Sequence, residues 1–290
     1  MPRTLFTPGH TACAGCGQAI AARLVIDAAG PETIVCNNTG CLEVFSTKYP
    51  ESAWEVPFIH SLFENAAAVA SGVESALKYL GIKEGINVIS QAGDGGTADI
   101  GLQALSGMWE RGHDILSVCY DNEAYMNTGI QRSGLTPFGS NTTTSPPGAA
   151  SFGNFRFKKP VPEIALAHGI PYVATASVAY PLDIQKKVKK ALSIKGPKYL
   201  QIHVPCPLGW RHEPHETVPV SKLAIDTGLY PIFEYENGKL TAVRKIAKVV
   251  PVEEYLKIQG RFKHLLNSPD QLKLVQEIAN RNIEKYGLKA

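Results

Sequence analysis

The segment of residues 86–127 places the strongest constraint on how this chain can fold. Residues 86–90 form an apolar run typical of a buried strand, and they lead into a Gly-Asp-Gly turn at residues 93–95. A helical stretch follows, and a second apolar run, residues 115–120, delivers the polar residue Asn122. Parallel strands are joined by crossovers of this kind. The polar residues after both strands are therefore expected at one edge of a parallel sheet, where open α/β sheets bind ligands.

The chain up to residue 209 repeats this alternation, which predicts the α/β fold class with a parallel sheet flanked by helices. The further strands expected are residues 33–36, 172–174 and 199–204, and the further helices are residues 18–28, 61–79, 162–168 and 181–193. Ser61 is expected to cap the second of these helices, with Glu64 at the capping-box position three residues later. Residues 47–60 contain Pro50 and Pro57 and are expected to be irregular.

Residues 210–290 show a different pattern. Prolines and short β runs surround a turn at residues 236–239 that predicts a hairpin, and two helices are expected at residues 252–265 and 270–286. The segment shows no core signature of its own. We therefore divide the chain into an α/β domain of residues 1–209 and a C-terminal extension that packs on this domain or on a partner subunit.

A long loop is expected directly after the predicted ligand edge. Residues 128–160 are rich in Gly, Ser, Thr and Pro. A segment of this length without regular structure, inside a compact domain, is usually functional or disordered. Its position favours a loop that covers the site or contacts a partner.

Composition and charge exclude several classes of protein. Hydrophobic residues make up 44% of the 290 residues, which is enough for a buried core. The formal charge of +3 is too small, and the basic residues are too scattered, to indicate nucleic-acid binding. No apolar run reaches the roughly 18 residues that a membrane span needs. The N-terminal residues do not resemble a signal peptide, so we expect a cytoplasmic protein with no nucleic-acid or membrane partner.

The Gly-Asp-Gly turn and the asparagine 28 positions after its aspartate have the chemistry of a metal–diphosphate site. A divalent cation needs oxygen ligands, and Asp94 and Asn122 offer a carboxylate and an amide oxygen, to which a main-chain carbonyl can be added. Gly93, Gly95 and Gly96 would let the backbone approach the phosphates closely. The turn alone would also fit a tight turn with an aspartate cap. The spacing to Asn122 is the thiamine diphosphate signature, and it favours the cofactor site.

Four cysteines form a second candidate site. Cys13 and Cys16 form a C-x-x-C pair, Cys41 follows a predicted strand, and Cys206 lies between two prolines at a strand end. Thiolates are soft ligands that suit an iron–sulfur cluster or zinc. The alternatives at this point are therefore a cluster, a zinc site or free buried cysteines. The remaining two cysteines, Cys36 and Cys119, lie inside apolar strand runs and are expected to be small buried hydrophobes.

Several motifs together resemble one enzyme family over residues 8–215. They are Cys-Ala-Gly-Cys-Gly-Gln from residue 13, Thr-Gly-Cys from residue 39, Ser-Leu-Phe-Glu from residue 61, Gly-Asp-Gly-Gly-Thr-Ala-Asp-Ile-Gly from residue 93, and Asp-Asn-Glu-Ala-Tyr-Met-Asn-Thr-Gly from residue 121. In these motifs the chain resembles the β subunits of pyruvate:ferredoxin oxidoreductases, also called pyruvate synthases. The resemblance continues in the tail with Cys-Pro-Leu-Gly-Trp from residue 206 and Thr-Gly-Leu-Tyr-Pro from residue 227.

The resemblance implies which residues bind the cofactors. It implies a [4Fe–4S] cluster on Cys13, Cys16, Cys41 and Cys206. It implies a Mg²⁺ ion held by Asp94, Asn122 and the carbonyl of Ala124. It places further residues beside the thiamine diphosphate: Gly40, Ser61, Glu64, Gly93, Gly95, Gly96 and Asn127, of which Asn127 is the candidate catalytic residue. Gln18 stands where the family often has Glu, and the roles of Gln18 and His60 stay open.

The activity implied is the reversible oxidative decarboxylation of pyruvate with coenzyme A to acetyl-CoA and CO₂. Electrons would leave one at a time through the cluster to ferredoxin. In this family another subunit supplies the pyrimidine-binding domain and the glutamate that activates the cofactor, and a ferredoxin-like subunit completes the complex. The isolated chain is therefore expected to be inactive. The alternatives are another 2-oxoacid substrate (oxalate, 2-oxoglutarate, a branched-chain or an aryl oxoacid) or a non-catalytic electron-transfer or scaffold subunit.

Overall fold

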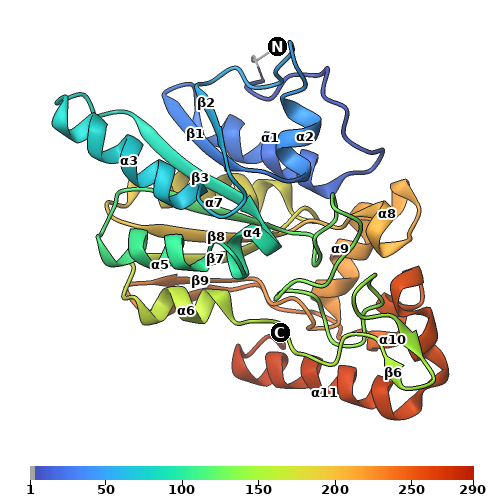
Figure 1. The fold of residues 1–290 in the computed structure, drawn as a ribbon. Coiled ribbons are helices and arrows are strands. Elements are labelled where there is room, and N and C mark those ends of the chain that lie inside the picture. The colour runs from blue at the N-terminus through green and yellow to red at the C-terminus, as the bar shows by residue number, and fades with distance from the viewer. Residues whose placement is uncertain (1–3) are drawn as a thin grey trace.

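The fold is built on one sheet of eight strands, in the order β10-β9-β7-β8-β4-β3-β1-β2 (Figure 1). The structure is a computed structural model, and it describes residues 4–290. The six strands from β7 to β2 in this order are parallel, and β9 and β10 continue the sheet as antiparallel strands. The predicted α/β class with a largely parallel sheet is confirmed.

The bounds of the elements follow. The strands are β1 Thr33–Asn38, β2 Phe58–Ser61, β3 Asn87–Gly93, β4 Leu116–Asp121, β7 Tyr172–Ser177, β8 Lys198–His203, β9 Phe233–Glu236 and β10 Lys239–Val243, with a separate hairpin of β5 Pro147–Gly148 and β6 Ser151–Phe152. The helices are α1 Gly17–Ala29, α2 Cys41–Ser46, α3 Ala66–Tyr79, α4 Asp94–Ala98, α5 Leu102–Glu110, α6 Val161–Ala167, α7 Pro181–Ser193, α8 Pro207–Trp210, α9 Thr217–Asp226, α10 Val252–Leu256 and α11 Pro269–Lys285, with 3₁₀ helices η1 Pro214–Glu216 and η2 Gly260–Asn267.

Helices cover both faces of the sheet. Helices α1 and α7 pack on one face and bury one apolar cluster, and α3, α5 and α6 bury a second cluster on the other face. Every residue of β4, β7 and β8 is buried, as expected for central strands of a parallel sheet that is covered on both sides. Cys36 and Cys119 are fully buried in the second cluster, which confirms their predicted role as small hydrophobes. None of the helices in residues 4–290 is long and apolar enough to cross a bilayer.

The segment around Ser61 differs from the prediction. Residues 58–61 form strand β2, which pairs in parallel with β1 so that Ser61 lies opposite Asn38. The helix begins only at Ala66, after Asn65. The predicted capping box at Ser61 and Glu64 is therefore wrong, because strand pairing holds Ser61 in an extended conformation. A four-residue edge strand after a proline-rich loop carries too short a pattern to be recognised from the sequence.

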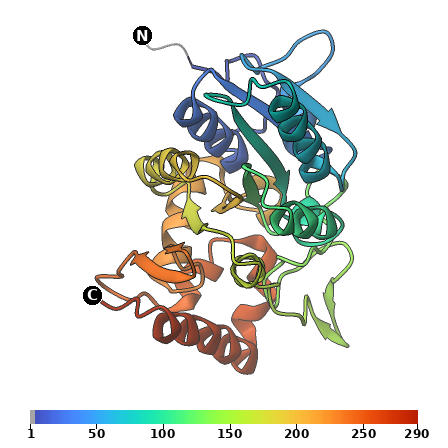
Figure 2. The ribbon, with the colours of Figure 1, turned by 90° about the vertical axis from the view of Figure 1, so that its left-hand side faces the viewer.

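The tail of residues 210–290 extends the same sheet. The predicted hairpin is present as β9 and β10, and β9 pairs with β7. In Figures 1 and 2 the tail, drawn in orange and red, lies at the end of the sheet opposite to the blue N-terminal elements.

The tail also has an apolar core, contrary to the expectation that it has none. This core gathers residues of α9, α10, η2 and α11 around Trp210 and Phe262. The single helix expected at residues 252–265 is interrupted at Gln259, whose backbone is extended (φ −119°, ψ 116°). The division of the chain at residue 209 stays a prediction, although β9 shares the sheet of the preceding domain.

The loop of residues 128–160 is ordered by buried polar contacts. The side-chain amide of Asn154 donates hydrogen bonds to the carbonyls of Thr136, Pro137 and Arg156. Leu135 is fully buried beside the sheet. The loop runs along the carboxyl edge of the sheet, where the candidate residues lie.

Candidate functional site

A cavity of about 250 Å³ lies at the carboxyl ends of the neighbouring strands β1, β3 and β4. The residues that line it are Gln18, Asn38, Thr39, Gly40, Cys41, Leu42, Phe63, Gly93, Asp94, Gly95, Gly96, Asn122, Ala124, Tyr125, Met126, Asn127 and Thr128. The structure thus brings together the candidate residues that follow three different strands. Ser61 and Glu64 do not line this cavity. Ser61 lies in the edge strand β2, where its carbonyl accepts a hydrogen bond from Thr39.

Three groups that can supply oxygen ligands converge at one point of this cavity. One terminal atom of the Asn122 side chain lies 2.8 Å from Asp94 Oδ1 and 2.8 Å from the carbonyl oxygen of Ala124. If that atom is the amide oxygen, three acceptors meet without a proton between them. If the amide is turned over, its nitrogen donates to both. Neighbouring oxygens around an octahedral Mg²⁺ lie about 2.9 Å apart, so the three groups have the spacing of adjacent metal ligands.

Asp94 is a buried carboxylate, and a negative charge in this position is stable only beside a positive charge. It is 1% exposed and accepts a short hydrogen bond from Ser133 Oγ. Burial, followed by the nearby charge of Asp121, raises the pKa of Asp94 well above its ordinary value. Lys158, whose charge acts on Asp94, forms its ion pairs with Asp121 and Glu123 instead. A divalent cation between the three oxygens would compensate the Asp94 charge.

Two glycines of the turn, Gly95 and Gly96, are required by the packing of the protein itself. A Cβ atom on Gly95 would lie 2.2 Å from the ring of Tyr125, and one on Gly96 would lie 1.9 Å from Nδ2 of Asn38. A Cβ on Gly93 would meet nothing within 4 Å. The absence of side chains at residues 95 and 96 therefore lets β1 and the loop after β4 close around the cavity.

Four cysteines from three segments of the chain approach one another beside the cavity. Cys16 and Cys206 are the N-cap residues of α1 and α8, and Cys41 is the first residue of α2. Burial raises the pKa of Cys41 to about 12, and the nearby thiols of the other three cysteines contribute in the same direction. Burial likewise raises the pKa of Cys206 to about 11. Neutral thiols would become thiolates on binding a metal centre.

The cysteines are not spaced as the ligands of a single ion. No set of three or more His, Cys, Asp or Glu side chains within residues 4–290 is close enough to hold one metal ion. An iron–sulfur cluster is larger than one ion, so its four thiolates stand further apart than the ligands of zinc. Thiols that lie near one another are a donor set that an iron–sulfur cluster can use.

Other polar residues of the site were not singled out from the sequence. Ser133 reaches Asp94 from the 128–160 loop, and Asn38 lines the cavity and donates to the carbonyl of Phe63. Gln18, whose role was open, lines the cavity, and its amide oxygen is buried without a hydrogen-bond partner. His60 lies outside the cavity lining and contacts the hydroxyl of Thr39 at 2.9 Å.

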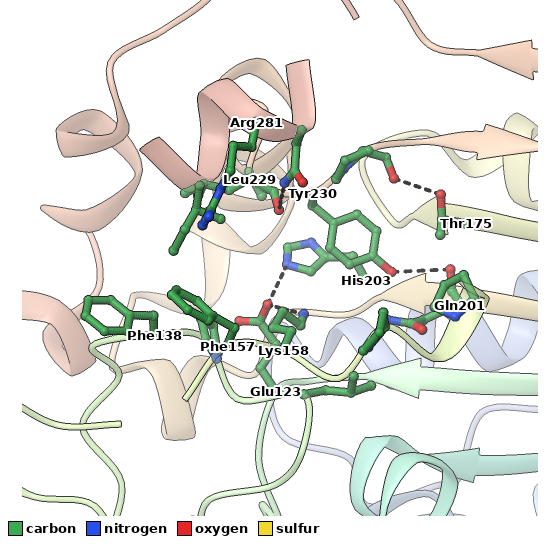
Figure 3. A pocket seen from close by; sticks show the side chains of 18 of the residues that line it. Glu123, Phe138, Phe157, Lys158, Thr175, Gln201, His203, Leu229, Tyr230 and Arg281 are labelled. Atoms are coloured by element: carbon green, nitrogen blue, oxygen red, sulfur yellow. Dashed lines mark hydrogen bonds and ion pairs between the residues drawn. The ribbon is translucent and has the colours of Figure 1, made fainter. Parts of the chain in front are cut away.

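A second and larger cavity lies on the other side of the loop after β4, under the tail (Figure 3). Its volume is about 320 Å³, and its walls include Phe138, Phe157 and Leu229, with Glu123 and His203 at its inner end. The candidate metal and cysteine ligands do not line it. The smaller cavity is therefore the candidate cofactor site.

Comparison with known proteins identifies the family. The family profile described as "Thiamine pyrophosphate enzyme, C-terminal TPP binding domain" matches residues 36–202. Pyruvate synthase subunit PorB of Methanosarcina barkeri is 56% identical over 290 residues, which cover 99% of this chain and 98% of the relative. The chain belongs to the thiamine pyrophosphate-dependent 2-oxoacid oxidoreductases.

Further relatives support the same family. Pyruvate synthase subunit PorB of Methanocaldococcus jannaschii is 55% identical, with 98% of this chain and 96% of the relative covered. Ketoisovalerate oxidoreductase subunit VorB of Pyrococcus abyssi is 51% identical, with 90% and 86% covered. The solved structure of a 2-oxoglutarate:ferredoxin oxidoreductase from Magnetococcus marinus matches with a TM-score of 0.57 and 25% identity, over 68% of this chain and 65% of that chain. The family resemblance expected from the motifs is confirmed.

Proposed function

We propose that this chain is the β subunit of a pyruvate:ferredoxin oxidoreductase and holds the diphosphate end of thiamine diphosphate through Mg²⁺. The observation that carries the proposal is the convergence of Asp94, the Asn122 side chain and the Ala124 carbonyl in one cavity. In this proposal these three groups hold the metal. Asn127 and Gly40 border the space beside it, and Asn127 is the candidate catalytic residue.

The four cysteines are proposed to hold a [4Fe–4S] cluster beside the cofactor. Cys41 supports this arrangement, because it both lines the cavity and lies near the other three thiols. Thiamine diphosphate held at Asp94, Asn122 and Ala124 would supply the electron sink for decarboxylation of a 2-oxoacid, and a cluster held by the four cysteines would supply a one-electron acceptor. The chain itself positions both groups and excludes water around Asp94, which is buried.

Pyruvate is the proposed substrate and coenzyme A the proposed acyl acceptor. The similar identity to the PorB and VorB relatives makes a branched-chain 2-oxoacid the second candidate. A panel of oxoacids given to the purified complex separates these two. We further propose that partner subunits supply the pyrimidine-binding domain with its activating glutamate and a ferredoxin-like electron carrier, that ferredoxin is the acceptor, and that the complex is cytoplasmic.

Cofactor binding to the complex, stripped of metal and cofactor, tests the proposal. Thiamine diphosphate should bind only when Mg²⁺ or Mn²⁺ is added, and Asp94→Ala should abolish this binding while the iron content stays unchanged. If Asp94→Ala still bound thiamine diphosphate in a metal-dependent way, Asp94 would not be a metal ligand. Zinc in place of iron in the purified complex would disprove the cluster assignment.

A further inference from the structure

The loop that carries two of the proposed metal ligands makes its turn at a single residue. Glu123 lies between Asn122 and Ala124 and has a φ of +69°, in the left-handed region. This turn lets the side chain of residue 122 and the carbonyl of residue 124 face the same point. A glutamate in this conformation is strained, and it is maintained only when the surroundings enforce it. The surroundings of Glu123 therefore bear directly on the metal site.

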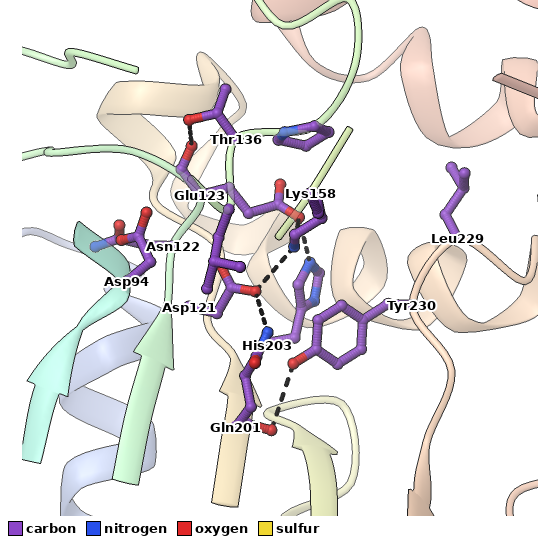
Figure 4. A network of polar contacts seen from close by, with 12 residues as sticks. Asp94, Asp121, Asn122, Glu123, Thr136, Lys158, Gln201, His203, Leu229 and Tyr230 are labelled. Atoms are coloured by element: carbon purple, nitrogen blue, oxygen red, sulfur yellow. Dashed lines mark hydrogen bonds and ion pairs between the residues drawn. The ribbon is translucent and has the colours of Figure 1, made fainter. Parts of the chain in front are cut away.

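The side chain of Glu123 lies in a network of ion pairs with Lys158 and Arg261, of which Figure 4 shows the part formed by Asp121, Glu123 and Lys158. Its carboxylate is 2.8 Å from Lys158 Nζ and 2.5 Å from Arg261 Nη2. Lys158 also pairs with Asp121 at 2.8 Å. His203, which is fully buried beside Glu123, is neutral at ordinary pH because burial lowers its pKa to about 3. The two positive and two negative charges thus balance.

The tail also reaches the main chain of this loop. The indole Nε1 of Trp210 donates to the carbonyl of Asn122 at 2.7 Å. From the 128–160 loop, Thr136 Oγ1 donates to the carbonyl of Glu123, also at 2.7 Å. The guanidinium of Arg261 lies 3.7 Å from the centre of the Trp210 ring, so the two tail residues support each other. Arg261 is 2% exposed, and its Nε donates to Gln259.

We propose that Arg261 is a positioning residue for the metal–diphosphate loop. Its ion pair with Glu123, supported by Trp210, holds Glu123 in the left-handed conformation, so that Asn122 and Ala124 face Asp94. The inference rests on the proposed function, because it concerns how the proposed ligands are held. It gives the C-terminal tail a role in cofactor binding in addition to its own packing.

Metal affinity of the complex, stripped of metal and cofactor, tests this role directly. Arg261→Met keeps much of the side-chain volume but removes the ion pair. It should raise the Mn²⁺ concentration for half-maximal thiamine diphosphate binding at least tenfold, with iron content unchanged, and Arg261→Lys should restore most of the loss. Lys198→Met is the matched control, since it breaks a buried 2.6 Å pair with Asp114 at the opposite edge of the sheet. That control should lower stability but leave the Mn²⁺ requirement unchanged.

A second pair of variants tests the backbone conformation and serves if Arg261→Met does not assemble. Glu123→Ala and Glu123→Gly both remove the carboxylate, but only glycine adopts a φ of +69° freely. Glu123→Gly should therefore bind Mn²⁺ about tenfold more tightly than Glu123→Ala. Equal Mn²⁺ affinities of Glu123→Ala and Glu123→Gly would overturn the inference. It would also be overturned if Arg261→Met needed no more Mn²⁺ for thiamine diphosphate binding than the Lys198→Met control. If the wild-type complex itself shows no metal-dependent binding, the proposed function falls, and this inference with it.

Discussion

Asp94→Asn should separate two effects of the Asp94 charge: the stability that the metal-free protein loses by burying it, and the stability gained when the charge binds the metal. Asp94 is 1% exposed, and its pKa is raised well above its ordinary value, mainly by burial and then by Asp121. The isosteric amide removes the charge and keeps the shape. The metal-free variant should therefore be at least as stable as the metal-free wild type, with a gain in unfolding free energy of about 1–3 kcal/mol.

Addition of the cofactor and its metal should reverse this order and make the wild type more stable than Asp94→Asn. At one hundred times the dissociation constant, a ligand adds about 2.7 kcal/mol to the stability of the state that binds it. For a chain of this size that is a rise in melting temperature of about 5 °C, at about 2 °C per kcal/mol. The wild-type complex should show this rise when Mg²⁺ and thiamine diphosphate are added together. Asp94→Asn should show none, because it lacks the anionic ligand.

The pH dependence of the stability of the metal-free complex provides a second test of the buried Asp94 charge. The folded-state pKa of Asp94 lies above its unfolded value of 3.8, so the folded state binds the proton more tightly. The bound proton on Asp94 stabilises the folded state at low pH. This stabilisation is lost as pH rises from about 4 through the raised pKa. Asp94→Asn should lack this loss when melting temperatures are compared across pH.

Asp114→Asn is the matched control at the opposite edge of the sheet. Asp114 pairs with Lys198 at 2.6 Å, and although burial opposes it, this partner lowers the pKa of Asp114 below its ordinary value. The control should lose about 1–3 kcal/mol of stability and keep the full cofactor-induced rise. A cofactor-induced rise in Asp94→Asn as large as that of wild type would refute the reasoning.

Three further changes test other parts of the structure. Gly95→Ala places a Cβ 2.2 Å from an aromatic ring and should cost about 1–3 kcal/mol in thermal denaturation, whereas Gly93→Ala should cost no stability because its Cβ meets nothing within 4 Å. Cys206→Ala should lower the iron content of the complex or make the cluster labile in air, and Cys36→Ala should leave iron analysis unchanged. Glu74 is fully buried and pairs with Lys78 and His113, which lower its pKa although burial opposes them. Its stabilising contribution is lost as pH falls below about 4.5, so Glu74→Gln should flatten the acid limb of a plot of melting temperature against pH.

The strand-end residues of the site could be predicted from the sequence because their pattern is local. An apolar run followed by glycine and polar residues shows both the strand and its carboxyl end, and parallel strands bring such ends together. Asp94 and Asn122 were found in this way, and they line one cavity. Ser61 and Glu64 were placed by a capping pattern, which strand pairing of residues 58–61 overrides.

The contacts that support the site could not be predicted, because they join distant segments without a periodic pattern. Ser133 lies 39 residues from Asp94, and Arg261 lies 138 residues from Glu123. Helix α9 was missed because Pro219 lies in its sequence, and proline in the first turn of a helix loses no hydrogen bond. The tail core depends on packing among such elements, so no single segment shows it.

Oxoacid-dependent reduction of a viologen dye tests the central claim most directly. The assembled complex, with Mg²⁺ and thiamine diphosphate bound, should reduce the dye when both pyruvate and coenzyme A are present. The same chain without its partner subunits should be inactive, because we propose that the activating glutamate comes from a partner. Reduction by the isolated chain at the rate of the complex, or no reduction by the complex with any 2-oxoacid, would contradict the account.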